Sequence, residues 1–188
     1  MNTSLTLTNP QVYEKPILII GYGSTEQEDV GAGYLVAKAI QNWRIENVKA
    51  LSVDILSPSL APLIIKAKTV IFVGSYNLYE HMKPELIIKH FLPNHSESNS
   101  KIIYDNPPQT LLGFINAVYH KIPEAYWILI PALNHELSSH LSHTTQRAIA
   151  QTLKYLRLNL DTSVSSSWDQ QNQRKFYHHQ WRQLKLIN

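Results

Sequence analysis

The chain contains no cysteine among its 188 residues. This absence excludes a disulfide scaffold, a thiol nucleophile and a zinc site built on thiolates. No apolar run approaches the roughly 20 residues that a transmembrane helix requires. The first residues, MNTSLTLTNPQVYEKP, lack a basic stretch followed by an apolar one, so we expect no secretory signal. The sequence thus predicts a soluble, cytoplasmic chain that is long enough to bury a core without disulfides.

Charged residues are also scarce, at 16% of the chain, and the small positive excess is localised. The formal net charge is +3, but residues 168–188 contain four basic residues and one acidic residue. Residues 1–167 therefore hold thirteen of each sign. Because the body is neutral, its charge does not predict a basic face for nucleic acid.

Several short stretches of the chain are wholly or mainly apolar. Such runs are typical of strands that are buried on both faces, as in a parallel sheet. They lie at residues 16–20, 50–56, 69–74 and 125–130.

Between these runs, apolar residues recur at helical spacing. This spacing predicts helices within residues 30–43, 111–119 and 141–156. Ser57 followed by Pro58 predicts the N-cap and first position of a short helix that continues to Lys66. The pattern of residues 84–91 fits either a helix or a strand.

The alternation of strands and helices implies crossover connections. It predicts a three-layer α/β/α sandwich with a mainly parallel central sheet over residues 16–160. Residues 1–15 form a polar leader, and residues 161–188 a linker and a basic, aromatic C-terminal helix. Because aromatic and basic residues interleave in that helix, it either packs on the body or contacts a partner, nucleic acid included.

The loop at residues 21–33 follows the first predicted strand, at the edge where open α/β sheets bind ligands. It is not a dinucleotide motif, because Glu26 stands where the third glycine of G-x-G-x-x-G would be. No Gly-Lys-Ser/Thr follows, which excludes a P-loop. The loop contains three acidic residues, Glu26, Glu28 and Asp29, which suit a cation or the positive end of the next helix.

Three blocks of sequence resemble the hydrogenase maturation proteases in order and spacing. The family opens with a strand, G-x-G-N-x-L-x-x-D-(D/E)-G-x-G and a helix, and the matching positions here are Gly21, Gly23, Asp29, Gly31 and Gly33. Its second block, H-D-x-x-P-x-x-L-L, resembles YDNPPQTLL at 104–112, followed by PEAYW at 123–127. A third block lies at 131–142, so the resemblance covers residues 16–156.

The resemblance implies the fold of this family, whose members trim the C-terminus of the large subunit of nickel–iron hydrogenase. It also implies three nickel ligands, and all three are replaced in this chain. The acid before G-x-G is Val30, the aspartate after the third strand is Gly74, and the histidine of the second block is Tyr104. None of these residues replaces a carboxylate or an imidazole as a nickel ligand at neutral pH. We therefore expect no nickel, and no cofactor, in this protein.

A substitute metal site remains an alternative, built from Glu28 or Asp29 together with His81 and Asp105. Such a site needs ligands at set distances and a supporting second layer of hydrogen bonds. With those ligands the chain would be an active endopeptidase, which trims the C-terminus of a hydrogenase large-subunit precursor.

The replaced ligands favour a different interpretation, a degenerate member of the peptidase family that keeps the binding fold. It would bind a hydrogenase large subunit, or the related complex I-type subunit, whose maturation needs no check for nickel. The predicted binding rim is Ser24, Glu26, Glu28, Asp29, Ser75, His81 and Asp105, at the ends of the first and third strands. A third interpretation is partner or nucleic-acid binding by the basic C-terminal tail.

Overall fold

The computed structural model describes residues 17–24, 26, 29–79, 81–91, 107–133 and 140–161. The chain divides into two compact units, Met1–Thr152 and Leu153–Asn188, with the boundary inside the last helix. The predicted leader at 1–15 and almost all of the predicted C-terminal extension lie outside the described residues. No helix of the described residues is long and apolar enough to span a membrane.

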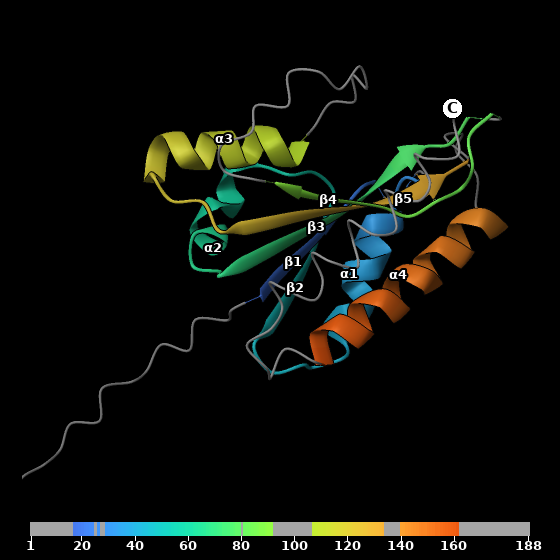
Figure 1. The fold of residues 1–188 in the computed structure, drawn as a ribbon, viewed down its shortest axis with the longest axis horizontal. Coiled ribbons are helices and arrows are strands. Elements are labelled where there is room, and N and C mark those ends of the chain that lie inside the picture. Colours follow the sequence, from blue (N-terminus) through green and yellow to red (C-terminus); the bar gives the residue numbers. More distant parts are fainter. Residues whose placement is uncertain are drawn as a thin grey trace, which may run out of the picture. The chain divides into compact units, whose positions relative to one another are not determined.

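A five-stranded sheet in the order β2-β1-β3-β5-β4 forms the centre of the first unit (Figure 1). Four strands are parallel, and β4 runs antiparallel to β5 at one edge. The strands are β1 (Ile17–Tyr22), β2 (Val48–Val53), β3 (Thr69–Asn77), β4 (Ile87–Phe91) and β5 (Glu124–Ala132). The mainly parallel sheet that the apolar runs predict is therefore confirmed.

Helices lie on both faces of this sheet, as Figure 1 shows. They are α1 (Ala32–Gln41), the 3₁₀ turn η1 (Pro58–Leu60), α2 (Ala61–Ile64), α3 (Pro107–Tyr119) and α4 (His143–Asp161). One face carries α1 and α4, the latter up to Thr152, and the other carries η1, α2 and α3. The α/β/α arrangement is thus the predicted one.

Two local expectations are settled by the structure. The ambiguous stretch at 84–91 contains the edge strand β4, whose backbone pairs with β5. Ser57 has the extended backbone of an N-cap residue, but its side chain makes no capping hydrogen bond. Its hydroxyl lies 2.6 Å from the Ser59 hydroxyl instead. The predicted positions of the N-cap and of Pro58 are confirmed, without a capping hydrogen bond from the serine side chain.

The central strands bury side chains on both faces because helices cover both. On the α2 and α3 side, Phe72 and Trp127 pack in a core with Ile64 and Ile115. The residues that alternate with these along β1, β3 and β5 point to the other side of the sheet, which α1 covers. They are buried as well, for example Ile19, Ile71 and Ile128. This double burial explains why the strands appear in the sequence as unbroken apolar runs.

Two glycines allow α1 to lie directly on the sheet. A Cβ atom on Gly33, in α1, would overlap the carbonyl oxygen of Val73 and lie 2.6 Å from that of Tyr22. A Cβ atom on Gly21, in β1, would overlap the carbonyl oxygen of Gly33. Helix and strand backbones are therefore in contact here, which fixes the start of α1 against the ends of β1 and β3.

We expect Gly33→Ala to lower the free energy of unfolding by about 3 kcal/mol, because the methyl group must push α1 away from two carbonyl oxygens. The matched control is Gly113→Ala in α3, where an added Cβ meets no atom within 4 Å. That substitution should raise stability by about 0.5 kcal/mol, since alanine favours the helix. Urea denaturation of both variants measures the difference, and equal stabilities would contradict the close packing.

Candidate functional site

The loops that follow β1, β3 and β5 meet at the carboxyl edge of the sheet. β3 and β5 stay paired as far as Asn77 and Ala132, beyond the point where the pairing of β1 with β3 ends at Val73. The pairing continues into the next loop, because the Leu78 amide donates to the Ala132 carbonyl at 2.9 Å. The predicted rim residues Ser24, Glu26, Asp29 and Ser75 belong to this edge.

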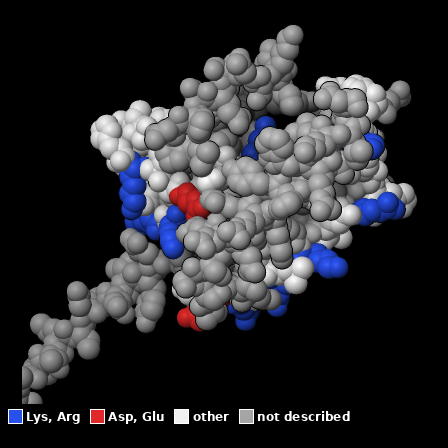
Figure 2. All heavy atoms as spheres, viewed as in Figure 1, with Lys and Arg blue, Asp and Glu red and all other residues white. Residues whose placement is uncertain are grey.

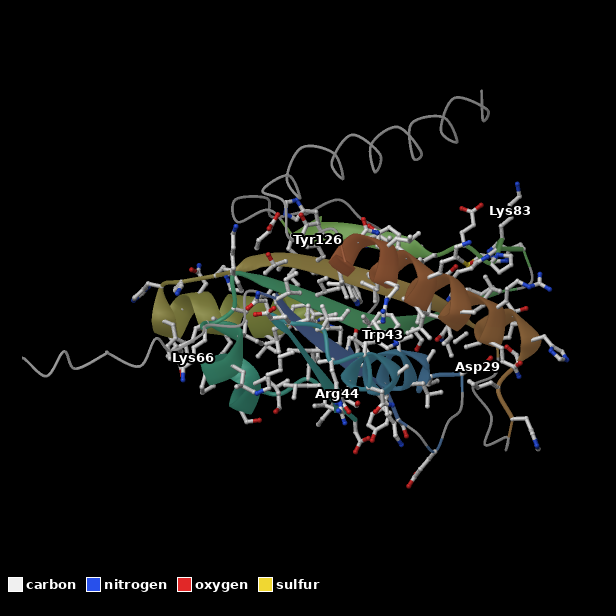
Figure 3. The ribbon with its side chains drawn as sticks, turned by 90° about the horizontal axis from the view of Figure 1, so that it is seen from below. Asp29, Trp43, Arg44, Lys66, Lys83 and Tyr126 are labelled. Atoms are coloured by element: carbon white, nitrogen blue, oxygen red, sulfur yellow. The ribbon has the colours of Figure 1, made fainter. Side chains whose placement is uncertain are left out.

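Asp29 is fully buried and joins two of these loops. Its Oδ2 atom accepts the Leu133 amide at 3.0 Å, and its Oδ1 atom accepts the Ser142 amide at 2.8 Å. Figure 3 shows Asp29 at the amino-terminal end of α4. The prediction of Asp29 as an exposed rim residue is therefore wrong, because both carboxylate oxygens are bound to backbone amides inside the protein.

The contact of Asp29 with Ser142 completes the N-cap of α4. The Ser142 hydroxyl accepts the Thr145 amide at 3.2 Å, as an N-cap residue does. In a capping box a glutamate of the helix itself would accept the N-cap amide. Here Asp29 accepts it from a distant loop, so a negative charge lies at the positive end of α4.

The other rim residues have different environments. Ser75 is half-buried and donates to the Val30 carbonyl at 3.1 Å, which ties β3 to the opening loop. Ser24 is half-buried and accepts the amide of the exposed Glu26 at 3.3 Å. His81 is exposed, and its ring stacks on Tyr79 with the ring centres 6.1 Å apart. Glu28 and Asp105 lie outside the described residues.

Two of the three positions at which the family resemblance implies nickel ligands are described, and neither offers a donor side chain. Val30 is half-buried, and Gly74 is buried one residue beyond the point where the pairing of β3 with β1 ends. Tyr104 lies outside the described residues. Within the described part of the chain, no three His, Cys, Asp or Glu side chains lie close enough to hold a metal ion together. The residues present at Val30 and Gly74 therefore do not fit nickel.

The space above Gly74 is filled by Tyr22. A Cβ atom on Gly74 would lie 2.5 Å from Cζ and 2.6 Å from the hydroxyl oxygen of Tyr22. That hydroxyl accepts the indole N–H of Trp127 at 2.9 Å. Burial raises the pKa of the Tyr22 phenol and the hydrogen bond from Trp127 lowers it, with burial the larger effect, so the phenol stays protonated at neutral pH.

Trp127 is itself fixed by neighbours from the edge strand. Its ring stacks on Phe91 with the ring centres 6.1 Å apart, and the Lys89 ammonium lies 5.6 Å from the ring centre. Gly74 is one of the predicted ligand positions, but Tyr22 and Trp127 do not figure among the predicted site residues. The signal of this group in the sequence is weak, a bulky aromatic residue between Gly21 and Gly23 and a glycine after an apolar strand.

Asp29→Asn should destabilise the protein by about 3 kcal/mol. The asparagine amide has only one acceptor oxygen, and its NH₂ group faces one of the two backbone amides. One charge-assisted hydrogen bond is therefore lost, and a buried backbone N–H is left without an acceptor. Asp54→Asn, at an exposed position, removes the same charge and should change stability by less than about 0.5 kcal/mol. Thermal unfolding of both variants measures the difference. If Asp29→Asn changed stability no more than Asp54→Asn, the carboxylate of Asp29 would not be what holds these loops together.

Comparison with known proteins identifies the fold. No family model and no curated protein matches the sequence. Among solved structures, the NiFe hydrogenase maturation protease HybD from Thermococcus kodakarensis matches with a TM-score of 0.61 and 17% identity over 76% of this chain and 97% of that one. HybD from E. coli matches with a TM-score of 0.56 and 15% identity, over 78% of this chain and 93% of its own.

A second protease of this kind from T. kodakarensis, HycI, has a TM-score of 0.54 and 19% identity. That match covers 79% of this chain and 94% of HycI. The matches span nearly the whole length of the solved proteins, and they confirm at the level of the fold the resemblance seen in the sequence. This chain has the α/β fold of the NiFe hydrogenase maturation proteases.

Proposed function

We propose that this protein is a catalytically degenerate, cytoplasmic relative of the hydrogenase maturation proteases that binds a protein partner without a metal. It acts as a binding or assembly factor for a hydrogenase large subunit or a related complex I-type subunit. The observation that supports the proposal is that the chain has the fold of these proteases, while the two described positions at which the family resemblance expects nickel ligands offer no donor side chain. The described ligand positions hold Val30 and Gly74, and Tyr22 fills the space above Gly74.

The fold supports the choice of partner. The three solved proteins compared above are named for hydrogenase maturation, and the two from T. kodakarensis for NiFe hydrogenases. Of the two proposed partners, a complex I-type subunit fits better with a protein that lacks nickel ligands, because nickel would have no part in the recognition of that subunit.

An exposed patch at the carboxyl edge supports partner binding. Tyr79 is 51% exposed and lies two residues after the end of β3, and Leu133 is 42% exposed and directly follows β5. The exposed His81 ring stacks on Tyr79. We call Tyr79, His81 and Leu133 the edge patch. Apolar and aromatic side chains that are exposed together at a ligand-binding edge are typical of protein interfaces.

The charge of the described surface favours a protein partner for the body of the chain. Among the described residues in view in Figure 2, lysine and arginine side chains lie at several separate places, mainly around the periphery of the view. A nucleic-acid site requires a basic patch or stripe that follows the phosphate backbone.

The proposal is tested by affinity capture with the full chain in the native organism, followed by intact-mass measurement of the captured subunit. We expect a hydrogenase large subunit or a complex I-type subunit whose C-terminus is complete. A captured subunit that this protein shortens in vitro would contradict degeneracy and establish the endopeptidase with substitute ligands. Capture of neither subunit would contradict the proposed partner.

The edge patch gives a second test. Tyr79→Ser and Leu133→Ser should each weaken binding of the captured subunit about tenfold or more, because both lose exposed apolar area at the centre of the proposed contact. Val118→Ser is the matched control, since Val118 is 52% exposed on α3, away from the carboxyl edge. Titration of the purified subunit gives the three dissociation constants. An equal effect of all three substitutions would exclude the edge patch.

Binding should also be independent of metal. Incubation of both proteins with EDTA, or addition of nickel after EDTA, should change the dissociation constant by less than about twofold, because the described site has no donor set for the ion. A loss of binding in EDTA that nickel restores would show that a metal takes part.

A further inference from the structure

We infer that Tyr22 occupies the place of the lost ligand side chain at position 74, so that the former metal site is closed by an aromatic residue instead of being left empty. The replacement of the acid at 74 and the presence of tyrosine at 22 are then one structural change. This closure is independent of which partner the protein binds.

The first support is steric. The nearest atoms to a Cβ on Gly74 are Cζ, the hydroxyl oxygen and Cε1 of Tyr22, at 2.5, 2.6 and 2.9 Å. Ordinary van der Waals contacts of a Cβ atom begin near 3.4 Å. Gly74 is not among the residues with positive φ, so its backbone suits any L-residue. The Tyr22 ring, and not the backbone conformation, therefore excludes a side chain at this position.

The second support is the path of the Tyr22 side chain across the sheet. Tyr22 lies on β1, Gly74 on β3 and Trp127 on β5, and these strands are successive neighbours. The ring passes over β3 at the one residue without a side chain, and its hydroxyl reaches the Trp127 indole at 2.9 Å. Gly74 thus provides the passage, and Trp127 provides the anchor at its far end.

The third support is that Tyr22 has little freedom to move aside. Its anchor, Trp127, is only 4% exposed and is held by Phe91 and Lys89 from β4. Release of the phenol would leave the indole N–H without its acceptor in a buried place, which is costly. An aspartate restored at position 74 would therefore meet the ring, and it would not rebuild a ligand. Removal of Tyr22 must accompany any restoration of the acid.

The test is a double-mutant cycle on the melting temperature of the full chain. Gly74→Ala should lower the melting temperature by about 5 °C or more in the wild-type background, because the added methyl group overlaps the ring. In the Tyr22→Leu background, which removes the atoms that crowd position 74, the same substitution should cost less than about 2 °C. Coupling of this kind is expected only for residues in contact.

Two further variants keep the test decisive if Tyr22→Leu fails to fold. Trp127→Phe removes the anchor and lets the phenol shift, so the cost of Gly74→Ala should fall in this background too. Gly113→Ala, whose added Cβ meets no atom within 4 Å, is the control glycine and should raise the melting temperature by the same small amount in every background. An equal cost of Gly74→Ala with and without the ring or its anchor would overturn the closure by Tyr22, whatever partner the protein binds.

Discussion

The carboxylate of Asp29 determines how the carboxyl edge of this protein is built. It accepts the amide after β5 with one oxygen and the N-cap amide of α4 with the other. The next residue, Val30, is tied to β3 through the Ser75 hydroxyl. Three segments that are far apart in the sequence thus meet within two residues of the opening loop. The geometry of the edge depends on this meeting point, because a buried charge with two amide partners tolerates little displacement.

The fold could be predicted from the sequence because its strands are buried on both faces. Such strands appear as unbroken apolar runs, and glycines follow them where α1 packs closely, as at Gly21 and Gly33. The edge strands β2 and β4 are exceptions, because almost all of their residues are half-buried. In the sequence, β4 shows neither an apolar run nor a clear alternation. Only its pairing with β5 determines that Ile87–Phe91 is a strand, and this pairing involves residues far along the chain.

The candidate site was predictable only in part, for a related reason. The positions Val30 and Gly74 follow from motif spacing along the chain. The roles of Asp29 and Tyr22 depend on neighbours across the sheet. An acid in a polar loop looks exposed in a sequence, and nothing local indicates that the amides of Leu133 and Ser142 will surround it. Likewise, the sequence shows a glycine at 74 but not the tyrosine from β1 that fills its place.

The carboxyl edge has an inner part, with Tyr22 and Trp127, and an exposed part, with Tyr79 and Leu133. Because the two parts are separate, a binding surface can be kept when a metal site is lost. Trp127 is buried in the core on the α3 side of the sheet and the half-buried Tyr22 packs against that core, whereas Tyr79 and Leu133 are exposed near the ends of β3 and β5. Asp29 holds the exposed part in place through the Leu133 amide, without help from any residue at position 74. Filling of the interior by an aromatic ring therefore leaves the contacts that shape the outer surface intact. In the proposed function, the chain lost its metal in the interior and kept its binding surface outside, since separate sets of contacts maintain the two.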